Sequence, residues 1–238
     1  MPKPDTTWRV LDHGPIEKLS ENVWRVQGAV PRMSLTRVMT VVRRRDGSLV
    51  IHNGIAMEES AMRELEAWGT PAILLVPNLA HRLDAPAYKA RYPALEVLAP
   101  RGSREKVAEV VHVDGSYEDF PNDDEVWLTT LPGIAESEGA MFVRSRDGTT
   151  IVLNDVVMNM DRRRDLLGFL FTTVMGSAPG PRVSRLAKLL FVKDKGVLRA
   201  ELERYAATEG LVRLIVAHDK VASGPDAARA LRTAATYL

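Results

Sequence analysis

A segment that occurs twice sets the strongest limit on the architecture of this chain. VVRRRDGSLVIHNGIAM, from Val41, aligns without gaps with FVRSRDGTTIVLNDVVM, from Phe142. Each copy places an Asp-Gly turn between two apolar stretches, which is typical of a β-hairpin. Two copies of one hairpin in 238 residues predict two similar half-units packed about a pseudo-twofold axis. A chance match between two charged Asp-Gly hairpins is the alternative that the sequence leaves open.

An apolar run that ends abruptly in polar residues gives the first indication of a site. Ile73–Val76 has a proline on either side and reads as a strand that is buried on both faces. In layered α/β proteins, ligands bind at the carboxyl ends of such strands. His81 and Asp84 follow this strand and are therefore functional candidates, while Asn78 and Arg82 are expected to line a substrate pocket.

Apolar patterning predicts the remaining elements. Strands are expected at 21–27, 38–43, 49–52, 96–99, 126–131, 141–144, 150–153 and 211–216, and helices at 58–68, 85–92, 104–111 and 197–207, with a last helix after Gly224. The pattern from 159 to 208 is helical and irregular, which indicates an insert. Since no linker or low-complexity run interrupts the chain, we predict one domain over residues 1–238.

Three more strand ends carry polar side chains, namely His52, Asp155 and His218. Imidazole and carboxylate groups bind Zn or Fe where cysteine is absent, and this chain has no cysteine. The same groups can act as a base and its orienting partner in metal-free acid/base chemistry. A single histidine at a strand end is also typical of a hydrogen-bonded structural residue, so convergence in space decides between these interpretations.

The order of these elements resembles the metallo-β-lactamase-like superfamily, an α/β fold built as a four-layer αββα sandwich of two similar halves. In that family the strand matching Ile73–Val76 is followed by His-x-His-x-Asp-His, and a later loop supplies another His. The second hairpin then ends in a metal-bridging Asp, and the last strand ends in His. Asp155 and His218 match the last two of these ligands. The other family ligands are replaced by Asn78, Ala80, Arg82, Leu83 and Ile134. The resemblance therefore implies a degenerate metal site.

The segments PNLAH and KARYP and the final AHDK are similar to a divergent branch of the superfamily, known only as a domain of unknown function. This resemblance implies that His52, His81, Asp155 and His218 surround one pocket and hold a single Zn or Fe ion. A protein without metal is the equal alternative.

Two functions follow from the resemblance. The first is a hydrolase in which one metal ion activates water to attack an ester, lactone or amide, with Asp84 orienting the water or a ligating imidazole. Without metal, Asp155 and His218 would form the catalytic carboxylate–imidazole pair. The second is an inactive pseudoenzyme that binds a small ligand or a partner protein, because a fold does not determine a function.

Charge and hydropathy limit the partners. A formal net charge of +1 argues against a broad nucleic-acid surface. RRRDLLGFLFTTVMG, from Arg162, places basic residues beside Leu166, Leu167, Phe169, Leu170 and Phe171. We expect this segment to be a lid or a homodimer helix packed over the pocket mouth, in preference to a helix on a membrane surface. The N-terminal MPKPDTTWRV has no apolar core typical of a signal peptide, so a cytoplasmic location is predicted.

Overall fold

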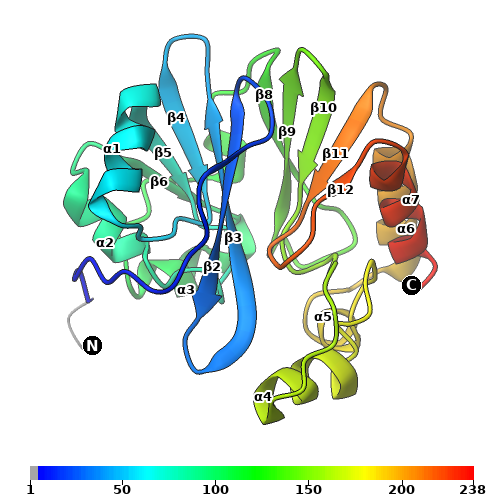
Figure 1. Ribbon diagram of the computed structural model, residues 1–238. Helices are drawn as coiled ribbons and strands as arrows, with labels where there is room; N and C mark the ends of the chain where they lie inside the picture. The colour runs from blue at the N-terminus through cyan, green and yellow to red at the C-terminus, as the bar shows by residue number, and fades with distance from the viewer. Residues whose placement is uncertain (1–4) are drawn as a thin grey trace.

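The computed structural model describes residues 5–238 and contains two β-sheets that pack face to face, each covered by helices on its outer side (Figure 1). Residues 1–4, which begin the stretch in which no signal peptide is predicted, lie outside the described residues. The first sheet runs in chain order through β1 (Glu17–Lys18), β2 (Val23–Val30), β3 (Met33–Arg43), β4 (Ser48–His52), β5 (Thr70–Leu75), β6 (Glu96–Ala99) and β7 (Gly115–Ser116).

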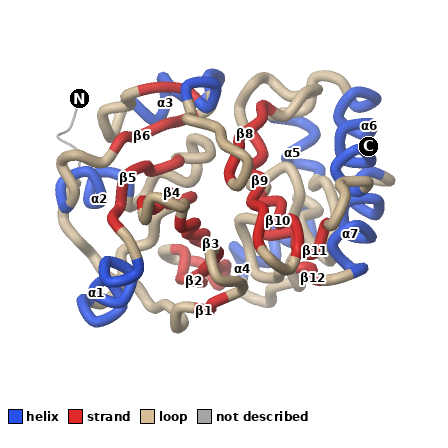
Figure 2. The backbone as a smooth tube through the Cα atoms, turned by 90° about the horizontal axis from the view of Figure 1, so that it is seen from above, coloured by secondary structure: helices blue, strands red, loops and turns tan. Residues whose placement is uncertain are grey.

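The second sheet has the order β12-β11-β10-β9-β8. Its strands are β8 (Val126–Thr130), β9 (Gly139–Ser145), β10 (Gly148–Val152), β11 (Leu211–Ile215) and β12 (Ala222–Ser223). The helices α1 (Glu59–Trp68), α2 (Ala85–Arg91) and α3 (Arg104–Ala108) lie outside the first sheet, and α6 (Lys195–Ala206) and α7 (Pro225–Ala235) outside the second (Figure 2). Two short 3-10 turns complete this half: η1 (Arg101–Ser103) directly precedes α3, and η2 (Tyr117–Asp119) follows β7. The predicted αββα sandwich is confirmed.

Alternate side chains of the central strands enter different cores. In β5, Ile73 and Leu75 point to the other sheet, whereas Leu74 packs under the helices of the first half. Met141 and Val143 of β9 meet the first sheet in the same inner core. Because both faces of these strands are buried, their sequences are unbroken apolar runs. These runs made the strands recognisable in the sequence.

The two halves repeat one arrangement of three strands. The hairpin β3–β4 continues into a parallel pair with β5, and the hairpin β9–β10 continues into a parallel pair with β11. The gapless sequence match slips by one residue after the turn, because Val42 pairs with Val50 but Val143 pairs with Thr150. The counterpart of His52 is therefore Val152 rather than Leu153, as their antiparallel partners also indicate.

The insert extends beyond the end of the sandwich. It contains the short helix α4 (Leu166–Phe169), a π-helical turn η3 (Leu170–Val174) and α5 (Arg185–Leu190), which in Figure 1 lie below the second sheet and beside the end of the β2–β3 hairpin. The Asp165 side chain caps α4 by accepting a hydrogen bond from the Gly168 amide. Between residues 5 and 238, no helix has the length and apolarity needed to cross a membrane.

Candidate metal centre

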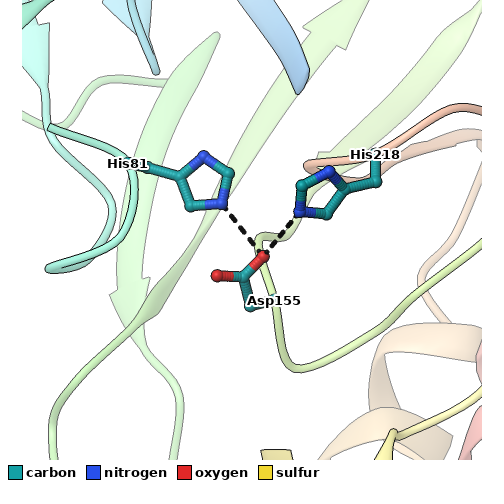
Figure 3. Close-up of side chains that lie close together, drawn as sticks. All are labelled: His81, Asp155 and His218. Carbon is teal, nitrogen blue, oxygen red and sulfur yellow. Dashed lines mark hydrogen bonds and ion pairs between the residues drawn. The ribbon is translucent and has the colours of Figure 1, made fainter. Parts of the chain in front are cut away.

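Three segments that are distant in sequence meet at the carboxyl ends of β5, β10 and β11. His81 lies in the loop after β5, Asp155 after β10 and His218 after β11. The Nε2 atoms of His81 and His218 lie 3.0 and 3.2 Å from the same atom, Oδ1 of Asp155. Figure 3 shows both imidazoles directed at this oxygen. The structure thus brings together three of the four residues that the sequence suggests as metal ligands.

A backbone carbonyl fixes the orientation of His218. Its Nδ1 lies 2.5 Å from the carbonyl oxygen of Thr36, and since a carbonyl only accepts, Nδ1 carries a proton. Nε2 is therefore the atom that faces Asp155. Burial opposes the imidazolium, but the hydrogen bond to Asp155 and the charge of its carboxylate outweigh burial and raise the pKa of His218.

The Asp155 carboxylate is held in its ionised form. Burial alone would raise its pKa, but the charge of His81 and the hydrogen bonds from His218 and His81 lower the pKa of Asp155 well below its ordinary value. An anionic carboxylate between two imidazoles balances charge inside a buried site.

The donor set fits one divalent cation. One ligand atom from each of His81, Asp155 and His218 lies within 4.8 Å of the other two. Two imidazoles and one carboxylate are a known ligand set for both zinc and non-haem iron. The hydrogen bond from His218 Nδ1 to Thr36 is the kind of outer contact that orients a ligating imidazole. A metal ion at this position would replace the contacts that now join the imidazoles to Asp155.

Asn78 and Glu138 form hydrogen bonds that position Asp155. Asn78 is fully buried and donates from Nδ2 to Asp155 Oδ2 at 2.7 Å and to Glu138 Oε1 at 3.0 Å, so it positions Asp155 instead of lining a substrate pocket. Glu138 also accepts from the amides of Asp155 and Val156, at 3.2 and 3.0 Å. Burial and the adjacent charge of Asp155 raise the pKa of Glu138 to about 8. Glu138 is not among the predicted site residues, although it directly precedes the buried strand β9.

His52 does not join the group of donor atoms. It is fully buried, and its Nδ1 has no hydrogen-bond partner among residues 5–238. Burial, followed by the charge of His81, lowers the pKa of His52 to about 3. The expected four-ligand set is corrected to three, and His52 is a neutral imidazole between the sheets.

Asp84 and Arg82 are engaged in other contacts. Asp84 Oδ2 accepts from Arg37 Nη2 at 2.6 Å and from the Ala56 amide at 3.0 Å, so it is not a spare carboxylate at the centre. Arg82 Nη1 binds Glu109 Oε2 at 2.9 Å and the carbonyl oxygen of Lys106. Neither side chain lines the cavity above His81 and His218. The expected roles of Asp84 in catalysis and of Arg82 in substrate binding are therefore corrected.

An apolar cavity of about 660 Å³ lies directly above the three donor residues. His81, Asp155 and His218 supply polar groups, and most of the remaining wall is hydrophobic, including Met33, Leu35, Phe171, Leu186, Leu190 and Phe191. Arg37 also reaches the cavity, but its guanidinium is paired with Asp84. The cavity therefore combines a volume suited to a small ligand with an apolar wall and a few convergent polar groups.

Two solved structures share this fold over nearly the whole chain. A structure of DIM-1 metallo-β-lactamase exposed to ceftazidime matches with a TM-score of 0.63 and 13% identity, covering 96% of this chain and 98% of that chain. A metallo-β-lactamase from Erythrobacter litoralis, with β-mercaptoethanol in its active site, matches with a TM-score of 0.61 and 13% identity over 94% and 96%. Neither a scan against protein-family models nor a search of curated proteins finds a match. The protein thus has the metallo-β-lactamase fold.

Proposed function

We propose that this chain, on its metallo-β-lactamase fold, binds one Zn or Fe ion through His81, Asp155 and His218 and hydrolyses an ester, lactone or amide. The observation that carries the proposal is the convergence of three donor atoms within 4.8 Å at the base of an apolar cavity. A bound divalent metal supplies Lewis acidity and lowers the pKa of coordinated water towards neutrality.

The chain's own residues position the substrate and the ligands. The apolar wall around Leu35, Phe171 and Leu186 favours a substrate with an uncharged, apolar body and removes water from it. Asn78 holds Asp155 Oδ2, which leaves Oδ1 facing the imidazoles. Because Arg37 is neutralised by Asp84, it adds little attraction for an anionic substrate.

Metal content is the first test. The protein is purified without a chelator or a metal-binding tag, and its metal is measured by elemental analysis alongside His81→Ala and His218→Ala. About one equivalent is expected in the parent protein and none in either variant, since two ligands hold a divalent ion poorly. His112→Ala is the matched control, because the His112 side chain is 76% exposed outside the cavity. Absence of metal from all samples, even after soaking in Zn²⁺, would sink the metal-dependent reaction.

Hydrolysis is tested with neutral p-nitrophenyl esters and lactones that carry short or long acyl chains. We expect longer chains to raise kcat/KM, because they bury more apolar surface in the cavity. Chelator should abolish turnover, and Zn²⁺ or Fe²⁺ should restore it. Turnover that is unchanged by chelator but lost in His218→Ala would instead identify metal-free general-base chemistry by Asp155 and His218.

The second candidate is binding without turnover. It is supported by the way both imidazoles close on one oxygen of Asp155, which satisfies these groups without any other ligand. Calorimetric titration with long-chain neutral esters distinguishes the two candidates. Tight binding by metal-free protein, unchanged in His218→Ala and accompanied by no hydrolysis, would favour the pseudoenzyme.

A further inference from the structure

The exposed apolar side chains of this protein are concentrated in one region. Residues 5–238 have ten exposed large hydrophobic side chains, and nine of them lie in the loop after β5 or between residues 166 and 190. Leu166 of α4 and Leu189 of α5 are 83% and 81% exposed. Isolated exposed leucines are ordinary, but a concentration of this kind marks a contact surface. We call these nine residues the apolar rim.

The apolar rim surrounds the entrance of the cavity described above. Leu79, Leu83 and Leu190 belong to the rim and also line the cavity, and Phe171 connects α4 and η3 to the same wall. Figure 1 shows α4 and α5 at the lower end of the molecule, below the second sheet. Whatever covers the rim therefore also covers the route into the cavity.

Charge is distributed in the same asymmetric way. Residues 161–199 contain nine basic and three acidic side chains, a net charge of +6, whereas the whole chain has +1 and the remainder therefore −5. Arg162, Arg164 and Arg185 are exposed, and none forms an ion pair with a described residue. Arg163, in contrast, is bound to Asp219 at 2.5 Å. Free cationic groups thus flank the apolar rim.

We infer that the apolar rim docks on an anionic lipid surface. Leu166, Phe169 and their neighbours would enter the interface, while Arg162 and Arg164 contact the lipid phosphates. The predicted lid does not account for these residues, because four of the five apolar side chains that define it are exposed. A second copy of the chain fits less well, since a symmetric contact places two segments of +6 against each other.

The cavity then opens towards the lipid, and an apolar ligand can enter it without crossing water. This inference does not rest on the proposed hydrolysis, because docking uses residues outside the metal centre. The two are therefore separable by experiment: vesicle binding should persist in metal-free protein and in His218→Ala.

The experiment is co-sedimentation of the full chain with vesicles of phosphatidylcholine alone or mixed with phosphatidylglycerol. We expect binding to the mixed vesicles at low salt, weaker binding at high salt, and little binding to phosphatidylcholine. Arg162→Gln with Arg164→Gln should weaken the partition coefficient by about fivefold for each charge removed. Leu166→Glu with Phe169→Glu should abolish binding.

Two matched variants control for charge and apolar exposure elsewhere. Arg146→Gln removes an exposed arginine from the β9–β10 turn, and Val197→Glu alters the one exposed large hydrophobic residue, among those described, that lies outside the rim. Both should bind as the parent protein does. The inference is overturned by absence of binding to mixed vesicles at low salt, or by equal losses in these controls. A homodimer that Leu166→Glu with Phe169→Glu dissociates, without vesicle binding, would also overturn it.

Discussion

In each half of the sandwich, a buried carboxylate accepts a hydrogen bond from a backbone amide in the segment after the hairpin, but the two carboxylates have different charged neighbours. In the first half, the Asp84 carboxylate accepts the Ala56 amide. In the second half, the Glu138 carboxylate accepts the amide of Val156, the counterpart of Ala56 once the one-residue slip is included. Asp84 is paired with Arg37, whereas Glu138 lies beside the like charge of Asp155.

This difference distinguishes a buried carboxylate that stabilises the fold from one that belongs to the candidate site. The buried Asp84 carboxylate is neutralised by the Arg37 guanidinium at 2.6 Å and is not free to bind a ligand. Glu138 has no cation beside it and its pKa is raised to about 8, so the negative charge rests on Asp155, where two imidazoles or a metal ion can stabilise it. The carboxylate of the first half therefore stabilises the fold, and the second half, together with the loop after β5, supplies the site.

Asp84→Ala should give the largest loss of stability. It leaves the Arg37 guanidinium buried without its partner, and breaking a buried pair in this way costs about 3–5 kcal/mol. The free energy of unfolding is measured by urea titration at pH 7, and metal content of the folded fraction is measured in parallel. If Asp84→Ala lost metal but kept its stability, the separation between the two halves would be wrong.

His52→Val tests the equivalent positions His52 and Val152 directly. The pKa of His52 is about 3 in the fold against 6.5 for the free side chain, so the unfolded chain binds a proton first as the pH falls. The contribution of neutral His52 to the free energy of unfolding is fully present above pH 6.5 and is lost as the pH falls towards 3. At pH 4 this loss amounts to about 3 kcal/mol. In chelator-treated protein, His52→Val should lose less stability than the parent between pH 6.5 and 4. Parallel curves for the two proteins would contradict the assignment.

The sequence predicts the fold better than the site because the two depend on different information. Strands such as Ile73–Leu75 are recognisable since both faces are buried, and that leaves a local apolar run. The partner of Asp84 is Arg37, 47 positions earlier, and no local pattern indicates this pairing. The matches Asn53 with Asn154 and Met57 with Met158 favoured a gapless alignment and concealed the slip at the turn.

Asp155 and His218 could be identified from the sequence because each follows a buried strand. That they converge with His81 on one point could be seen only in the folded structure. Glu138 was missed because it follows Glu136 and Ser137 in a stretch that reads as a polar loop. The exposure of Leu166 was equally hidden, since an apolar helical residue is usually buried and sequence does not tell which neighbour is absent.

Glu138→Gln should give the smallest change in stability and the most specific one. The amide of the new side chain cannot accept from all three donors that face Glu138, so one bond is lost, at a cost of about 1–2 kcal/mol near pH 5. The altered support of Asp155 should weaken metal binding by about 10- to 100-fold, measured by competition with a chromophoric chelator.

The pH dependence of the same variant has the opposite sign to that of His52→Val. Because the pKa of Glu138 is raised to about 8, the folded protein retains a proton that the unfolded chain releases above 4.5. The stability from this group is fully present below pH 4.5 and is lost as the pH rises to about 8. Chelator-treated Glu138→Gln should therefore be less sensitive than the parent to a rise from pH 7 to 8, and His52→Val should match the parent there, because the His52 contribution is complete above pH 6.5. Equal alkaline losses in all three proteins would mean that Glu138 is as well neutralised as Asp84, and the contrast between the halves would fail.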